Sequence, residues 1–259
     1  MMKLKKITGN ILFFAVLILL WQLLYTAACD WFSLAKPYAF PSPLGVLACL
    51  SLLLTNGTLL SAVCGSMLRV LTGFGISILI GILLGICIVH SKYLAGNLKP
   101  LILGIQTLPS ICWVPFAILW FGLSESAIIF VVVMGSSFGI AIAIENCIKN
   151  VPPIYIRAAR TMGVDSYQLY RSVIFPAALP SFVAGLKQGW SFAWRALMSG
   201  EVMSSSMGLG YTLMLGRDLA DINQVMTVML VIVLIGAAID KGVFALIEGR
   251  VLKKRGMTL

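Results

Sequence analysis

Long apolar runs, separated by short polar segments, make up most of this chain. A transmembrane helix needs about 20 apolar residues to cross the hydrocarbon core of a bilayer. The runs that approach this length are residues 11–28, 66–89, 100–121, 126–147, 178–199 and 224–247. The pattern predicts an all-α, polytopic membrane protein with six transmembrane helices. Because further runs follow the first one, we expect residues 11–28 to remain as an uncleaved helix and not as a signal peptide.

The segment 29–65 interrupts this pattern between the first and second runs. It contains Pro37, Pro41 and Pro43, followed by a mildly amphipathic stretch from Leu44 to Leu54. We interpret that stretch as a helix that lies at the membrane interface and does not cross the membrane.

Charged residues are distributed unequally between the two sides that six spans would create. Outside the apolar runs, one side carries 13 lysines and arginines, whereas the other carries only Lys36 and Arg217 together with most of the acids. Because cytoplasmic loops of membrane proteins are rich in cations, we expect both termini and the loop 148–176 in the cytoplasm. The expected organisation is a cytoplasmic N-terminus (1–10), a transmembrane domain (11–247) with an outer segment (29–65), and a basic cytoplasmic tail (248–259).

Composition agrees with the membrane class and argues against several others. Of the 259 residues, 60% are hydrophobic and 11% are charged, and the mean hydropathy is +1.01. Soluble domains carry about 25% charged residues. The net charge of +10 does not indicate nucleic-acid binding, because the cations lie in short clusters between apolar runs. The six cysteines form no Cys-x-x-Cys pair and His90 is the only histidine, so no metal site is expected.

Small residues in the second run predict close helix packing. Ser77, Gly81 and Gly85 recur every four residues and therefore share one helix face. Small side chains on such a face allow another helix to approach closely. Arg69, near the outer end of this run, is expected to extend its charge to the interface.

The third run contains polar residues that are candidates for a substrate path. Pro109 and Pro115 free backbone carbonyls, and Gln106, Thr107 and Ser110 lie nearby. In a membrane, the freed groups need either protein neighbours or a wet cavity. The prolines therefore indicate either a structural bend or a lining of the path, and the clustered polar groups favour the lining.

The fifth run is unusually polar for a transmembrane helix. Lys187, Ser191 and Arg195 recur at intervals of four and share one face, and Gln188 and Glu201 are further candidates nearby. Cations inside a membrane usually face a protein interior or a water-filled path, so this face is a candidate for attracting a small anion. The alternative is that Lys187 lies at the cytoplasmic edge and that Arg195 pairs with an acid or a backbone carbonyl.

The loop 148–176 begins with the features of a folded helix–turn–helix. Pro152 and Pro153 favour a helix start, and residues 154–161 are long enough for two turns. Gly163 then allows a sharp reversal of the chain.

A second short helix is expected after this reversal. Asp165 fits an N-cap, with Gln168 three residues on, and the helix would run to about Ser172 and end at Pro176. The alternative is an ordinary basic loop that only fixes the orientation of the chain. The prolines, the glycine and the cap together favour a shaped element on which a soluble partner docks.

This loop resembles the EAA motif of ABC importer permeases. That motif reads Glu-Ala-Ala, three residues, Gly, nine residues, Ile, one residue, Leu-Pro. This chain has Arg157-Ala158-Ala159, Gly163, Val173 and Phe175-Pro176 at the same spacing. Arg157 departs from the usual Glu, which bears on any salt bridge made there but not on the helix–turn–helix shape.

Further segments resemble the nitrate, sulfonate and taurine branch of that family, and the resemblance covers nearly the whole chain. The segments are Phe40-Pro41-Ser42-Pro43, Arg69-Val70-Leu71-Thr72-Gly73-Phe74, Pro176-Ala177-Ala178-Leu179-Pro180-Ser181, Trp194-Arg195, Glu201 and Gly208-Leu209-Gly210. The resemblance implies a location in the bacterial inner membrane. It also implies a small anionic substrate, namely an aliphatic sulfonate, taurine or nitrate, with bicarbonate, cyanate or a vitamin precursor such as a pyrimidine as alternatives.

The resemblance also implies the partners. Two permease subunits would form the path, either two copies of this chain, which we expect, or one copy and a homologous partner. Two ATPase subunits would bind the loops 148–176, and a periplasmic or lipid-anchored binding protein would deliver the substrate. ATP and Mg would be used by the ATPase subunits, and no cofactor is expected on this chain. The chain has no Gly-x-x-x-x-Gly-Lys-Ser/Thr sequence, so we do not expect it to be an enzyme.

Two other classes of protein remain as alternatives. An ion-coupled secondary transporter typically has an inverted repeat and polar ion sites at mid-membrane, whereas the acids here fall mostly at the ends of the runs. A membrane-embedded enzyme would need paired carboxylates, a metal-ligand cluster or a Ser/His/Asp set, and none is apparent in the sequence.

Overall fold

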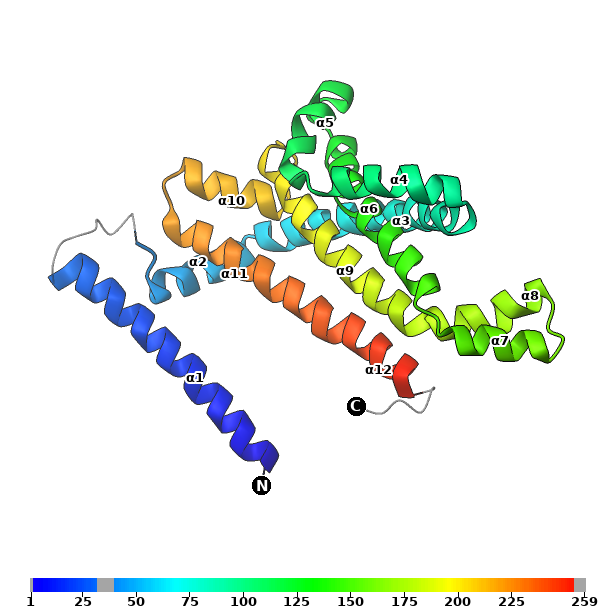
Figure 1. Ribbon diagram of the computed structural model, residues 1–259. Coiled ribbons are helices and arrows are strands. Elements are labelled where there is room, and N and C mark those ends of the chain that lie inside the picture. The colour runs from blue at the N-terminus through cyan, green and yellow to red at the C-terminus, as the bar shows by residue number, and fades with distance from the viewer. Residues whose placement is uncertain (1, 32–39, 254–259) are drawn as a thin grey trace. The chain divides into compact units, whose positions relative to one another are not determined.

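The computed structural model describes residues 2–31 and 40–253, and every element of regular structure in those residues is helical (Figure 1). This agrees with the predicted all-α class. The α-helices are α1 (Met2–Tyr25), α2 (Pro43–Thr55), α3 (Thr58–His90), α4 (Lys92–Gln106), α5 (Val114–Phe121), α6 (Glu125–Lys149), α7 (Pro153–Thr161), α8 (Ser166–Gln168), α9 (Phe175–Val202), α10 (Leu209–Asp218), α11 (Ile222–Ile239) and α12 (Ala245–Lys253). Shorter segments with π or 3₁₀ geometry are η1 (Thr26–Trp31), η2 (Ser110–Trp113), η3 (Leu169–Ile174) and η4 (Asp240–Phe244).

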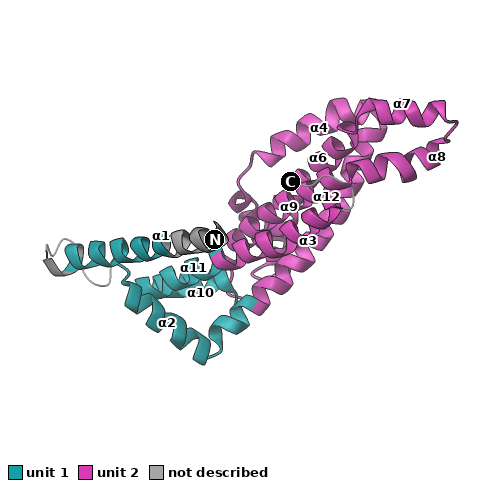
Figure 2. Ribbon diagram, turned by 90° about the horizontal axis from the view of Figure 1, so that it is seen from below, with its two compact units in different colours: residues 1–63, 207–233 teal, residues 64–206, 234–259 magenta. Residues whose placement is uncertain are grey.

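Two compact units divide the chain (Figure 2). Unit 1 contains residues 1–63 and 207–233, and unit 2 contains residues 64–206 and 234–259. Most residues that the sequence marks as functional candidates belong to unit 2.

Four helical segments in the described part of the chain are long and apolar enough to cross a membrane. They are Thr58–His90, Glu125–Lys149, Ser166–Val202 and Ile222–Lys253. The segments Lys92–Gln106 and Ser110–Phe121 pass the same test only together, as a bent pair that would make a fifth crossing. The described apolar part of the first predicted span, Ala15–Tyr25, is shorter than a crossing. A sixth span therefore remains a prediction.

The third predicted span, residues 100–121, is a broken helix and not a continuous one. The two segments on either side of the break meet at an angle of 99°. Proline has no N–H and disfavours helical geometry in the residue before it, and Pro109 has an extended conformation at the break. The amides of Thr107 and Leu108 bond to the carbonyls three residues earlier, at 3.2 and 3.0 Å, so α4 ends in a tightened turn.

Helix α3 packs closely against α6 in unit 2 along a row of small residues. A methyl group placed on Gly81 would lie 2.6 Å from Ile140, and one on Gly85 would lie 2.7 Å from Ile144. At the start of the row, Ser77 Oγ accepts a hydrogen bond from the hydroxyl of Ser136 at 2.8 Å. No real Cβ atom tolerates such short distances, so only residues without large side chains permit this approach.

Helix α6 contacts α9 in the same way on another face. A methyl group on Gly135 would lie 2.6 Å from the Ala196 side chain, and one on Gly185 would lie 2.7 Å from Ala143. Gly139 leaves room for the ring of Phe192, which would lie 2.8 Å from a methyl group there. Helix α6 is therefore the buried centre of unit 2, with α3 and α9 packed against it.

The prediction that Pro176 ends a short helix is wrong. Asp165 caps the helix as expected, since its Oδ1 accepts a hydrogen bond from the Gln168 amide at 2.7 Å. The helix then continues as one segment, Ser166–Val202. The π-helical stretch η3 ends at Ile174, two residues before Pro176, and interrupts the ordinary hydrogen-bond ladder. Pro176 thus lies in the first turn of α9, where its missing N–H costs little.

In unit 1, the amphipathic stretch after Pro43 forms α2. The Ser42 hydroxyl caps this helix by accepting a hydrogen bond from the Gly45 amide at 2.9 Å. The Ser42 amide donates to Asn223 Oδ1 at 3.1 Å, and the Thr227 hydroxyl lies 3.1 Å from the Val46 carbonyl oxygen. These contacts join α2 to α11, and the position of α2 at the membrane interface remains a prediction.

Candidate functional site

The break between α4 and α5 borders a cavity in unit 2 with an empty volume of about 800 Å³. Gln106, Thr107 and Ser110 line it from the break, and Arg195 lines it from α9. The other lining residues are Ile105, Leu108, Pro109, Trp113, Met134, Gly135, Phe138 and Phe192. Four of the eight substrate-path candidates therefore meet at one cavity, although they come from two distant parts of the sequence. We call it the Arg195 cavity.

The guanidinium of Arg195 supplies the positive charge of this cavity. Its Nε donates a hydrogen bond to the Ser191 carbonyl at 3.1 Å, and its Cζ lies 5.1 Å from the centroid of the Phe192 ring. Among the described residues, no carboxylate forms an ion pair with Arg195. Arg195 therefore has the backbone-carbonyl partner that the alternative named, and this bond occupies only Nε. A guanidinium of this kind is suited to bind the oxygens of a ligand anion.

The opposite side of the Arg195 cavity carries uncharged polar groups. Gln106 Oε1 is buried and has no hydrogen-bond partner in the described part of the chain. A buried polar atom without a partner costs about 1–3 kcal/mol, so a water molecule or a ligand donor in the cavity would stabilise it. The hydroxyls of Ser110 and Ser199 lie 3.1 Å apart and bond to each other.

Three other candidates from the fifth run do not line this cavity. Lys187 Nζ lies 3.3 Å from Asp240 Oδ1, so its charge is neutralised by η4. Gln188 and Ser191 are exposed on α9. The intervals of four place Lys187, Ser191 and Arg195 on one face, but only Arg195 reaches the cavity.

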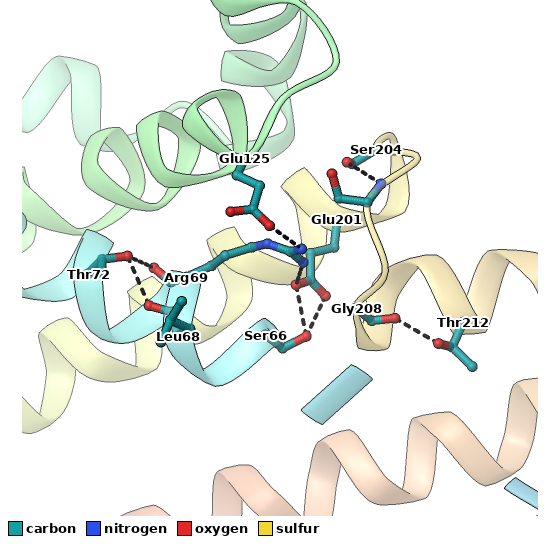
Figure 3. Close-up of polar contacts among 10 residues, drawn as sticks. Ser66, Leu68, Arg69, Thr72, Glu125, Glu201, Ser204, Gly208 and Thr212 are labelled. Carbon is teal, nitrogen blue, oxygen red and sulfur yellow. Dashed lines mark hydrogen bonds and ion pairs between the residues drawn. The ribbon is translucent and has the colours of Figure 1, made fainter. Parts of the chain in front are cut away.

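Glu201, the eighth candidate, belongs to a separate charge cluster near the ends of α6 and α9 (Figure 3). Its carboxylate accepts a hydrogen bond from Arg69 Nη1 at 2.9 Å, and the Ser66 hydroxyl lies 2.8 and 2.7 Å from its two oxygens. Arg69 Nη2 donates to Glu125 Oε1 at 3.0 Å. Arg69 is only 4% exposed, so the prediction that it extends to the interface is wrong. Pairing with a buried acid outweighs the access to water that Arg69 would gain at the interface.

A second buried acid, Glu145, was missed by the sequence analysis. Its fully buried carboxylate accepts from Lys99 Nζ at 2.9 Å and from Lys149 Nζ at 2.6 Å. An acid inside an apolar run is itself a signal, because intramembrane carboxylates need partners. The Lys149 contact could have been predicted from the spacing of four residues. The Lys99 contact could not, because it crosses 46 residues of sequence.

The helix–turn–helix resemblance falls on a folded element made by α7, α8 and η3, of which α7 and α8 are labelled in Figure 1. Ala159 is buried on α7 and packs into a cluster with Leu169 and Ile174. Cys147, Val151 and Ala178 complete the buried part of this cluster. Gly163 has φ +76° between the helices, in the left-handed region that favours glycine. The element therefore has its own apolar core and a defined turn.

The outer surface of this element combines apolar and basic side chains. Met162 is 81% exposed and Ile154 is 59% exposed. Arg157 and Arg160 are also exposed on α7, and among the described residues neither forms an ion pair. Exposed apolar groups of this size on a shaped element indicate a protein-binding surface.

Comparison with protein families gives one match that covers most of the chain. The family model described as "Binding-protein-dependent transport system inner membrane component" matches residues 77–252. The match includes the Arg195 cavity and the element formed by α7, α8 and η3.

Three similar curated proteins carry transport names. The putative aliphatic sulfonates transport permease protein of Bacillus subtilis is 29% identical over 93% of this chain and 85% of its own length. The taurine transport system permease protein of Escherichia coli is 27% identical over 93% of this chain and 88% of its own. The nitrate import permease protein of Synechocystis sp. is 27% identical over 88% and 83%, respectively.

Solved structures show a related fold. A chain of the MetNI methionine ABC transporter, in an inward-facing conformation, superposes with a TM-score of 0.61 and 21% sequence identity. The superposition covers 78% of this chain and 97% of that chain. At this identity the likeness concerns the arrangement of helices.

Proposed function

Because the chain belongs to the family of binding-protein-dependent transport system inner membrane components, we propose that it forms half of the transmembrane path of an ATP-driven importer for a small oxyanion. The chain is a membrane-spanning permease subunit of the ABC importer type. The nature of the substrate, the partners and the orientation are the parts that we propose.

The single observation that carries the substrate proposal is the Arg195 cavity. It combines a guanidinium that has no carboxylate partner among the described residues with a buried amide oxygen that has no partner either. Sulfonates, nitrate and taurine each present oxygens that an arginine fork can bind. The names of the three relatives point to the same class of small anions. An aliphatic sulfonate, taurine or nitrate is therefore the proposed substrate.

The broken span supports a role for this cavity in transport. Irregular backbone at membrane depth is tolerated where it is buried in protein or lines a water-filled cavity. Residues 107–109 form such an irregular segment, and all three of them line the Arg195 cavity. A break of this kind also lets the two half-helices move separately during transport.

The element formed by α7, α8 and η3 is the proposed docking site of the ATPase subunits. Its apolar and basic surface suits a partner groove with apolar walls and acidic residues. Because the element has its own apolar core, a movement of the partner would be passed on to α9. This proposal places the element and both termini in the cytoplasm. ATP and Mg are then bound by the ATPase subunits, while a binding protein delivers the substrate from the other side to a pair of permease chains.

Transport by the complete reconstituted complex tests this proposal. Uptake of ethanesulfonate, taurine, nitrate and bicarbonate is compared with that of a neutral pyrimidine, with and without the binding protein. We expect one of the oxyanions to be accumulated in an ATP-dependent manner. Accumulation of the pyrimidine alone, or uptake without ATP, would contradict the proposal.

Replacement of Arg195 tests the cavity itself. Arg195→Gln should lower oxyanion uptake at least tenfold, because the replacement removes the only charge that the cavity offers among its lining residues. Arg195→Lys should retain part of the uptake, since it keeps the charge but loses the fork. The matched control is Arg217→Gln, which changes an exposed arginine paired with Asp218. Equal uptake by Arg195→Gln and the control would rule the cavity out as the anion path.

A further inference from the structure

A large apolar groove lies in unit 2, away from the residues that line the Arg195 cavity. Its empty volume is about 1440 Å³. It is bounded by the C-terminal third of α3, the last two turns of α6 and the first half of the Ser166–Val202 helix. The lining residues are Ile82, Ile86, Val89, His90, Ile144, Cys147, Ile148, Tyr167, Tyr170, Arg171, Ile174, Phe175, Ala178, Leu179 and Phe182. No part of the proposed transport function uses this groove.

The groove is lined by apolar side chains along most of its length and by polar side chains at one end. On α3 its wall extends from Ile82 to Val89, and on α9 it reaches Phe182. At 1.5 Å per residue, the apolar wall on α3 is about 10 Å long. The polar lining groups lie near helix ends, because His90 is the last residue of α3 and Arg171 lies just after the start of the long helix.

The polar end offers positive charge and hydroxyl groups without a carboxylate. Arg171 and His90 are both exposed, and among the described residues neither forms an ion pair. Tyr167 and Tyr170 contribute two phenolic hydroxyls, and no Asp or Glu lines the groove. Tyrosines concentrate at the level of lipid headgroups in membrane proteins. This end of the groove is therefore complementary to an anion at the membrane surface.

We propose that this groove binds an anionic phospholipid of the surrounding bilayer. One acyl chain lies along the apolar wall, and the phosphate is held by Arg171, with His90 and the tyrosine hydroxyls as further donors. A guanidinium binds a phosphate through two parallel hydrogen bonds. Basic pockets between transmembrane helices are a recognised kind of site for anionic headgroups. Because the chain spans the membrane, phospholipids of the bilayer surround the groove.

The groove adjoins the base of the docking element. Cys147, Ile174 and Ala178 line the groove and also belong to the apolar cluster that supports α7 and η3. A bound acyl chain would fill space beside this cluster. Occupancy of the groove would therefore stabilise the element through which the ATPase is proposed to act.

Native mass spectrometry of the purified complete complex tests the site. The complex is titrated with phosphatidylglycerol or with phosphatidylcholine of the same acyl chains. We expect phosphatidylglycerol to bind at least fivefold more tightly. Arg171→Gln should reduce this preference to less than twofold, because it removes the main hydrogen-bond donor to the lipid phosphate. Arg160→Gln is the matched control, since Arg160 is exposed on α7 and does not line the groove.

A second variant tests the apolar wall independently of charge. Ile86→Trp should fill the groove and lower the retention of both lipids, while the complex keeps its size and assembly. Equal binding of the two lipids, an unchanged preference in Arg171→Gln, or unchanged retention in Ile86→Trp would each overturn the proposal. A complex that retains no lipid at all would also overturn it and would point to a helix of a second copy in the groove. Failure of transport would leave these binding results unaffected, so the two proposals are separable.

Discussion

Arg69 divides its guanidinium between two carboxylates that differ in their access to water. Glu201 is fully buried, whereas the side chain of Glu125 is 63% exposed. A buried charge that loses its buried partner is strongly destabilising, because water does not reach the site to replace that partner. An exposed partner contributes at most about 1 kcal/mol. The two acids should therefore differ greatly in their importance for stability.

We expect Glu201→Gln to destabilise the protein by up to about 3–5 kcal/mol, because it leaves the buried Arg69 with only the exposed Glu125 as a charged partner. This corresponds to a fall in the midpoint of thermal unfolding of roughly 10 °C. The matched control is Glu125→Gln, which should change the stability by less than about 1 kcal/mol. Thermal unfolding of the purified chain in detergent measures both. Similar midpoints for the two variants would contradict the assignment of Glu201 as the buried partner.

Single residues show what sequence patterns can and cannot reveal. Gln106, Ser110 and Arg195 stood out because polar groups beside prolines, or inside an apolar run, are unusual. The pairing of Arg69 with Glu201 crosses 132 residues of sequence, and no local spacing indicates it. Only the packing of α3 and α9 on α6 brings these charges together.

At the scale of elements, the turn between α7 and α8 depends on one backbone conformation. Gly163 has φ +76°, and a methyl group placed there would meet no atom within 4 Å. A substitution at this position therefore acts through backbone strain and not through a clash. Left-handed conformations cost most residues about 1–2 kcal/mol, and asparagine tolerates them better.

We expect Gly163→Val to reduce the coupling of ATP hydrolysis to uptake at least fivefold, because the strained turn displaces α7 from its core. The measurement is the number of substrate molecules taken up per ATP hydrolysed by the reconstituted complex. Gly163→Asn is the matched control and should keep most of the coupling. Normal coupling in Gly163→Val would argue against a docking role for this turn.

Helix caps were more predictable than helix ends. The Asp165 cap could be read from the sequence because the carboxylate and the amide that it accepts from lie three residues apart. Pro176 does not end the helix, because the π-helical stretch before it already interrupts the regular hydrogen-bond pattern to which the proline N–H would have contributed. Whether a proline ends, kinks or joins a helix depends on the turn that precedes it, and sequence periodicity does not record that turn.

At the scale of the whole molecule, the distribution of charge predicts the orientation in the membrane. We expect the α7 element to face the cytoplasm and Arg217 to face the other side. In a background without native cysteines, Met162→Cys and Arg217→Cys are labelled with a membrane-impermeant maleimide on right-side-out vesicles. Arg217→Cys should react directly, and Met162→Cys only after permeabilisation. Reaction of both from one side would contradict the orientation.

Most of the helical architecture could be predicted from the apolar runs, because each crossing helix must satisfy its backbone hydrogen bonds within itself. The run 126–147 corresponds to α6, and the run 224–247 lies within Ile222–Lys253. The run 100–121 has the right length for one helix, yet it folds as two that meet at 99°. Hydropathy indicates that a segment prefers lipid to water, but it does not indicate whether the segment crosses the membrane as one straight helix.

The Lys99–Glu145 contact gives the broken span a mechanical property. Lys99 lies seven residues before Gln106 on α4, an arm of about 10 Å. A tilt of about 10° around this pivot would displace the far end of α4 by roughly 2 Å. Thr107 and Leu108 bond back into α4 and the ladder ends at Pro109, so a tilt of α4 that bends the chain at Pro109 breaks no helical hydrogen bond. A tilt of α4 about the Lys99–Glu145 salt bridge would thus widen or narrow the Arg195 cavity at the C-terminal end of α4.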